Sequence, residues 1–140
     1  MLRQFLASIL LTMCFFSCKP LIALYDANAY SQAVSIKVDL QNLIDTASTV
    51  DYSNAVAQIN QMNTEIKKAM EYDKGRDKDS ISTKQYEMLY SDAHSYQAFL
   101  KIWQAEGKVS KAFSTEYKST IEKTMDEIIK LENGKNKSNN

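Results

Sequence analysis

Apolar residues recur every three or four positions along most of the chain, a spacing that places them on one face of an α-helix. The pattern predicts four amphipathic helices. They run from about Asp26 to Val50, from about Tyr52 to Lys74, from Ser82 to the residue before Gly107, and from Ser110 or Ser114 to the residue before Gly134. Four such helices with short connections predict an all-α, up-down-up-down four-helix bundle over residues 26–134. Residues 135–140 are expected to form a disordered tail.

The turn-forming residues agree with long helices. The chain has only three glycines and one proline, which are few for a fold rich in β-turns. Each glycine directly follows a predicted helix, as expected for a helix C-terminal residue. Ser82 and Gln85 have the spacing of a capping box, which predicts that the third helix begins at Ser82.

Two of the predicted helix boundaries allow more than one structure. Residues 49–54 carry several capping side chains and predict a tight turn, although one long helix through them is also possible. Ser91 and Asp92 both cap well, so the third helix is either kinked or broken there. The large side chains expected to anchor the core are Phe99, Leu100, Trp103 and Phe113.

The first twenty residues have a different pattern. Arg3 precedes an uncharged, mostly apolar run, Phe5–Phe16, which Lys19 and Pro20 end. This run fits the ~7–15 residues of a signal-peptide core better than the ~20 residues of a membrane-spanning helix. The segment therefore predicts export from the cytoplasm.

Ser17 followed by Cys18 resembles the lipobox of bacterial lipoprotein signal peptides, with Phe15 and Phe16 where that family usually has leucine and a small residue. The resemblance implies removal of residues 1–17, diacylglycerol and fatty acid such as palmitate on Cys18, and a lipid-anchored tether over residues 18–25. It implies an envelope protein held on the inner or outer membrane, at a periplasmic or surface face. An uncleaved N-terminal anchor and an ordinary secretory signal, cut near Ala23 or Ala29, are the alternatives.

Charge and cysteine content narrow the function classes. The chain carries 17 basic and 17 acidic residues, a balance that gives no reason to expect a nucleic-acid partner. Cys14 and Cys18 both lie in the export segment, so the body has no disulfide and no thiolate ligand. With one histidine in the chain, a thiolate or imidazole metal site is not expected, and neither is a cofactor.

Two polar clusters have residue types that could form a catalytic or metal site. Asp92 and His94 are the one acid–histidine pair, and we interpret them as a helix cap beside a partly exposed histidine. Asp73, Asp77 and Asp79 suggest a calcium loop, but position twelve of the EF-hand pattern would be Lys84 or Met88 instead of glutamate. These aspartates are therefore expected in a solvated loop without a metal, and the sequence identifies no catalytic residue.

Eight tyrosines are distributed over all the predicted helices. Most are expected to edge the core with their hydroxyl groups in water. Tyr72, Tyr86 and Tyr90 flank the same loop and are the candidate surface for a protein or glycan partner. Lys135 and Lys137 are expected to be solvated.

The sequence favours a lipid-anchored, non-catalytic helical interaction module with an unknown envelope protein as partner. A small envelope enzyme using tyrosine, lysine and carboxylate groups in an interhelical cleft is one alternative. A purely structural envelope bundle is the other.

Overall fold

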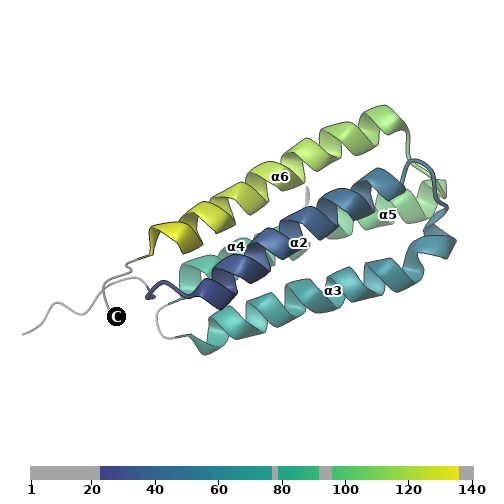
Figure 1. Cartoon of the computed structure of the whole chain (residues 1–140). Helices are drawn as coiled ribbons and strands as arrows, with labels where there is room; N and C mark the ends of the chain where they lie inside the picture. The colour runs from purple at the N-terminus through teal and green to yellow at the C-terminus, as the bar shows by residue number, and fades with distance from the viewer. Residues whose placement is uncertain (1–22, 77–78, 92–95, 136–140) are drawn as a thin grey trace, which may run out of the picture.

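The computed structural model describes residues 23–76, 79–91 and 96–135. The described helices are α2 (Ala27–Thr46), α3 (Tyr52–Gly75), α4 (Ser80–Ser91), α5 (Tyr96–Glu106) and α6 (Lys111–Gly134). In Figure 1, α4 and α5 lie end to end and together form the third leg of the bundle. The predicted all-α bundle is confirmed.

The helices pack around one apolar core. α2 packs against α3 and α6, α4 packs against the same two helices, and α5 packs against α3 and α4. Successive legs run in opposite directions, so α2 begins at the end of the bundle where α6 finishes (Figure 1). We call this the terminal end. The opposite end, which holds the α2–α3 and α5–α6 connections, is called the connection end.

Three helices begin at side-chain caps. Asp26 accepts hydrogen bonds from the backbone N–H groups of Asn28 and Ala29, and Asp51 caps α3 in the same way. Ser110 caps α6 by accepting from the N–H of Phe113. These caps satisfy backbone donors that have no partner within their helix. Of the two predicted starts of the last helix, Ser110 is therefore confirmed.

α2 and α3 are separate helices. α2 ends at Thr46, four residues before the predicted end at Val50, and a turn connects it to α3. The backbone of this turn is joined to the α5–α6 connection, because the N–H of Val109 donates to the carbonyl of Ala47 at 3.1 Å. The connection end is thus closed by backbone hydrogen bonds between its two loops.

The three glycines do not play the same role. Gly107 has φ +72°, a left-handed conformation that glycine adopts at little cost, so it ends α5 as predicted. Gly75 and Gly134 lie inside α3 and α6, whose C-caps are Arg76 and Lys135. The prediction that they follow their helices is wrong by one residue.

The predicted core anchors are buried with one exception. Phe99, Leu100 and Trp103 lie in the core, and the indole N–H of Trp103 donates to the carbonyl of Val50 at 3.2 Å. Phe113 is only half-buried and stacks on Phe99 with ring centroids 6.2 Å apart. Phe113 therefore covers the core from its edge.

α4 is described as far as Ser91 and α5 from Tyr96 onward, so Asp92, and with it the predicted kink or break, falls outside the described residues.

None of the helices in the described part of the chain combines the length and the apolar character needed to cross a bilayer.

Candidate functional site

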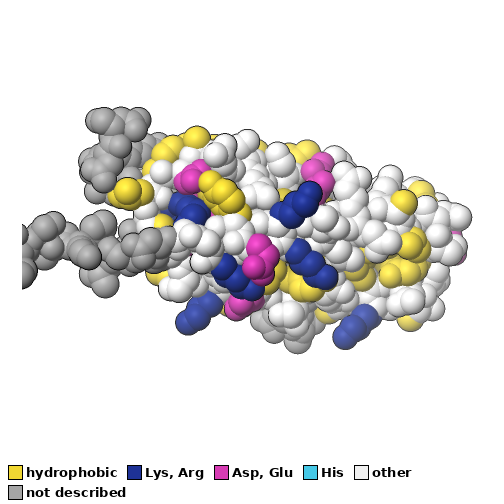
Figure 2. Space-filling model, turned by 90° about the horizontal axis from the view of Figure 1, so that it is seen from below, with side chains coloured by type: hydrophobic (Ala, Val, Ile, Leu, Met, Phe, Trp, Pro, Cys, Tyr) yellow, Lys and Arg dark blue, Asp and Glu magenta, His cyan; other side chains and the backbone are white. Residues whose placement is uncertain are grey.

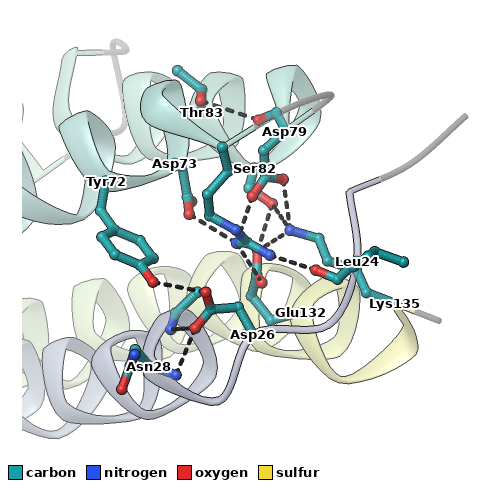
Figure 3. A network of polar contacts seen from close by, with 12 residues as sticks. Leu24, Asp26, Asn28, Tyr72, Asp73, Asp79, Ser82, Thr83, Glu132 and Lys135 are labelled. Carbon is teal, nitrogen blue, oxygen red and sulfur yellow. Dashed lines mark hydrogen bonds and ion pairs between the residues drawn. The ribbon is translucent and has the colours of Figure 1, made fainter. Parts of the chain in front are cut away.

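Five charged side chains meet inside the terminal end of the bundle (Figure 3). Asp73 lies in the last turns of α3 and Arg76 directly follows that helix, while Asp79 immediately precedes α4. Glu132 lies in the last turn of α6 and Lys135 follows it. These five residues are called the ion network. Their side chains are almost entirely removed from solvent, with Arg76 the most exposed at 12%.

Arg76 connects the three acidic members of the ion network. Its Nη1 atom lies 3.1 Å from Oδ1 of Asp73, 2.5 Å from Oδ2 of Asp79 and 3.1 Å from Oε2 of Glu132. Its Nη2 atom donates to the backbone carbonyl of Leu24 at 2.6 Å. A guanidinium group suits this position because it offers several donors in one plane. Arg76 therefore ties the ends of α3 and α6 to the residues before α2.

Lys135 supplies the second cation. Its Nζ atom lies 2.5 Å from Oδ1 of Asp79, 2.5 Å from Oε1 of Glu132 and 2.9 Å from the hydroxyl oxygen of Ser82. The Ser82 hydroxyl donates in turn to Oε1 of Glu132 at 2.6 Å. Three acceptors match the three donors of an ammonium group. Lys135 thus fixes the end of α6 onto the start of α4.

The residues just before α2 are part of this arrangement. We call residues 23–25 the N-terminal strap. Ala23 is buried, and the carbonyl of Leu24 is held by Arg76. Directly after the strap, the Tyr72 hydroxyl donates to Oδ2 of Asp26 at 2.7 Å. Within the predicted tether over residues 18–25, the buried Ala23 and the backbone carbonyl of Leu24 contact the terminal end, while the Leu24 side chain is 41% exposed.

Asp73 has the least compensated charge of the ion network. Its Oδ1 atom contacts Arg76, but among the described residues its Oδ2 atom has no hydrogen-bond partner. Burial, followed by the nearby charges of Asp79 and Glu132, raises the pKa of Asp73 to about 6, although Arg76 acts in the opposite direction. A buried carboxylate without full compensation holds a proton more tightly than one in water.

The ion network also affects its apolar surroundings. Tyr86 of α4 is buried, and its pKa is raised, first by burial and then by the negative charge of Asp73. The Tyr86 hydroxyl therefore stays protonated beside the carboxylates. A buried phenol of this kind is a packing group with a polar tip.

The three carboxylates of the ion network lie close enough together to form a cation site. One oxygen each from Asp73, Asp79 and Glu132 lies within 4.8 Å of the others, a grouping that can hold a metal ion. Arg76 and Lys135 already contact these carboxylates from within the chain. These internal contacts therefore link four segments of the chain to one another. They are the residues before α2, the end of α3, the start of α4 and the end of α6.

Shallow hollows lie on the described surface of the bundle, among them two that Asp73 and Asp39 line. One, of about 400 Å³, opens between α3 and α4 next to the ion network and includes Asp73, Lys74 and Thr83. The other, of about 180 Å³, lies between α2 and α3 and includes Asp39, Gln61 and Glu65. Burial and the charge of Glu65 raise the pKa of Asp39. Both hollows are open and lined mostly by polar side chains.

The three predicted surface tyrosines are not equivalent. Tyr72 is 39% exposed, whereas Tyr86 is only 2% exposed. Tyr90 is half-buried, with the Lys67 ammonium 5.5 Å from the centre of its ring. Tyr86 cannot contact a partner in this fold, because its position on α4 faces the core. A partner contact through Tyr72 or Tyr90 stays a prediction.

Four charged or polar residues are placed differently from expectation. Asp73 and Asp79 were expected in a solvated loop, but both are buried. Lys135 was expected in a disordered tail, yet it is 3% exposed and part of the ion network. Ser82 was expected to cap a helix, but α4 begins at Ser80 and Ser82 contacts Glu132. For Asp79, Lys135 and Ser82 a hydrogen-bonding partner comes from a distant segment, whereas Asp73 pairs with Arg76 three residues away.

Helical spacing contained a signal for this cluster. Asp73 continues the stripe formed by Ile66 and Ala69, and Glu132 continues the stripe formed by Met125 and Ile128. A charged residue at a core position is unusual unless it is paired. Two such residues on two helices are the pattern that predicts a buried ion network.

The remaining candidate residues lie outside the described part of the chain. They are Cys14, Cys18, Asp77, Asp92, His94 and Lys137. Comparison of the chain with protein-family models, with curated proteins and with solved structures found no match in any of the three.

Proposed function

We propose that this chain is a lipid-anchored helical module of the bacterial cell envelope that binds a partner protein and carries out no chemistry of its own. The Ser17–Cys18 pair, with its resemblance to a lipobox, supports acylation at Cys18. The proposal keeps the bundle attached to the inner or outer membrane. Attachment raises the local concentration of the module, so that a weak contact there becomes effective.

The N-terminal strap is the observation that carries the proposal. Ala23 is buried at the terminal end, and Arg76 holds the carbonyl of Leu24. Ala23 is five positions after Cys18, and five fully extended residue steps span at most about 18 Å. In the proposed arrangement the terminal end therefore lies next to the bilayer, and the connection end points away from it.

The half of α3 nearer to the connection end is the surface proposed for the partner. Residues 52–64 contain no charged side chain. Its exposed members include Asn54, Val56, Gln58 and Gln61. On the face shown in Figure 2, charged side chains gather over the half nearer to the termini and the other half is mostly neutral. Neutral surface costs less to desolvate than charged surface, and the centres of protein interfaces are depleted in charge.

Metabolic labelling with a clickable fatty-acid analogue in a bacterial host tests the anchor. We expect the full-length chain to carry the label and to fractionate with membranes. Cys18→Ala should lose the label, and the matched control Cys14→Ala should retain it. Unlabelled wild-type chain, or equal labelling of Cys18→Ala, would rule the lipid anchor out.

Proximity labelling from intact cells tests the partner surface. The wild-type chain is compared with Gln58→Glu/Gln61→Lys, which adds one charge of each sign to the neutral half of α3. A partner that is enriched by the wild type and lost by the double variant supports the proposal. Enrichment that survives the double variant contradicts the proposed surface. The alternatives of a small envelope enzyme and a structural bundle gain no specific support from the described residues.

A further inference from the structure

Among the described residues, the ion network has one positive charge fewer than it has negative charges. Within the described residues it joins the carboxylates of Asp73, Asp79 and Glu132 to the cations of Arg76 and Lys135. All of these side chains are largely withdrawn from water. An uncompensated charge is costly in such surroundings. The network is therefore expected to recruit one more positive charge.

The contacts show which carboxylate lacks a partner. Oδ1 of Asp79 accepts a hydrogen bond from Lys135, whereas its Oδ2 atom has no hydrogen-bond partner among the described residues but lies 2.5 Å from Nη1 of Arg76. Both oxygens of Glu132 are paired with the same two cations. Asp73 is held through one oxygen only, and its Oδ2 atom has no partner among the described residues. The excess negative charge is thus centred on Asp73.

We propose that the ion network binds one proton at Asp73 and that this proton tightens the terminal end around the N-terminal strap. With Asp73 neutral, two carboxylates face two cations and the buried charges balance. Arg76 then pairs with one fewer anion and keeps its hydrogen bond to the carbonyl of Leu24, which is 2.6 Å long. The fold thereby contains a pH-sensitive latch between the strap and the bundle.

The groups that face Asp73 from the neighbouring elements determine the pH range. Asp79, which precedes α4, and Glu132 of α6 favour the protonated form, as does burial. Arg76 and Lys135 favour the ionised form. On α4 the neighbour is Tyr86, whose phenol stays neutral. From the α2 side, Asp26 acts on Arg76. These influences give Asp73 a pKa of about 6 instead of 3.8.

The sign of the effect follows from this difference. The folded chain binds the proton more tightly than the unfolded chain, so this group adds stability as the pH falls through about 6 toward about 4. The added stability is lost as the pH rises above 6. Asp26 and Asp45 have lowered pKa values and act in the opposite direction at acidic pH. A comparison of variants is therefore needed to isolate Asp73.

A role for the latch in the cell rests on the proposed function, because an envelope protein meets the pH of its surroundings. Release of the N-terminal strap would add residues 23–25 to the tether. Three extended residues lengthen it by about 10 Å. The latch would then control how far from the membrane the bundle can reach.

Urea unfolding of the full-length chain at several pH values tests the latch. Asp73→Asn mimics the protonated side chain in size and charge. The matched control is Asp126→Asn, which changes a carboxylate that is 58% exposed. Near pH 7.5, above the pKa of Asp73, we expect Asp73→Asn to lower the unfolding equilibrium constant at least tenfold relative to the wild type. This advantage should shrink about tenfold by pH 5, because proton binding at Asp73 then stabilises the wild type. At one pH unit below the pKa, that binding lowers the unfolding constant of the wild type by about tenfold. Asp126→Asn should follow the wild type.

Two outcomes would overturn the latch. In the first, Asp73→Asn destabilises the chain by the same factor at every pH, which would make Asp73 an ordinary salt-bridge partner. In the second, millimolar Ca²⁺ or Mg²⁺ stabilises the wild type but not Asp73→Asn and removes the pH dependence, which would assign the missing charge to a metal ion. NMR titration of the Asp73 carboxyl carbon in the wild type gives an independent check. Cys18→Ala should keep the latch, so failure of the lipid anchor and failure of the latch are distinguishable.

Discussion

The two ends of the bundle are closed by different kinds of interaction. At the connection end, the backbone N–H of Tyr52 donates to the carbonyl of Gly107 at 2.8 Å, the indole N–H of Trp103 donates to the carbonyl of Val50, and Val109 of the α5–α6 connection belongs to the core. At the terminal end, Arg76 and Lys135 hold three buried carboxylates together. Backbone hydrogen bonds and apolar packing do not titrate near neutral pH, whereas buried carboxylates do. The difference places the carboxylate with a pKa of about 6, Asp73, at the terminal end.

Trp103→Ala is expected to give the largest effect and acts on the connection end. The Trp103 side chain is fully buried, and the Tyr52 ring packs edge-on against it with centroids 5.6 Å apart. Its truncation should cost about 3–5 kcal/mol of unfolding free energy, because it leaves a large cavity and an unpaired carbonyl at Val50. Urea unfolding followed by far-UV circular dichroism measures the loss. Equal losses at pH 5 and near pH 7.5 are expected, and a strongly pH-dependent loss would contradict the comparison between the two ends.

Arg76→Met acts on the terminal end and should cost about 3 kcal/mol near neutral pH, because it leaves buried carboxylates without their cation. The cost should be smaller near pH 5, where protonation relieves the uncompensated charge. The matched control is Lys74→Met, since Lys74 lies two residues away with a largely exposed side chain that pairs with Glu71. Its loss should be much smaller than that of Arg76→Met, because an exposed ion pair contributes little to stability. An Arg76→Met loss that does not change with pH would show that Arg76 acts through packing alone.

The same contrast explains which parts of the structure could be predicted from the sequence. The caps at Asp26 and Ser110 and the stop at Gly107 are local signals, because each acts on backbone groups a few residues away. The buried anchor Trp103 belongs to a periodic apolar face. Local chemistry and periodicity were therefore enough to predict the bundle and its connection end.

The ion network could not be predicted in this way because its partners are far apart in the chain. Arg76 and Glu132 are 56 positions apart, and Lys135 and Asp79 are separated by the same number. A lone charged residue is more often solvated than buried. Its burial becomes favourable only when packing brings the opposite charge to it, which no local pattern encodes. For the same reason Ser82 has the spacing of a cap and instead contacts Glu132.

Two glycine substitutions compare the two ends of the bundle through the smallest expected changes in unfolding free energy. Gly107, at the connection end, has φ +72°, and an added Cβ atom would lie 2.9 Å from Oδ2 of Asp51. Gly107→Ala should therefore cost about 1–2 kcal/mol, through the left-handed conformation and the crowded carboxylate. Gly75, at the terminal end, is helical, and no atom of its described surroundings lies within 4 Å of such a Cβ. Gly75→Ala should stabilise the chain by about 0.5 kcal/mol, because alanine loses less backbone freedom on folding.

Opposite signs for the two variants, measured by urea unfolding under one set of conditions, would show that a strained turn fixes the connection end while the end of α3 tolerates a better helix former. A loss for Gly75→Ala would indicate that the terminal end needs backbone freedom at this position. Since Gly75 directly precedes Arg76, that freedom would be needed to let the guanidinium group reach Leu24, Asp79 and Glu132 together. The sign for Gly75→Ala therefore decides whether the ion network is held by side-chain charges alone or also depends on the backbone that carries its central cation.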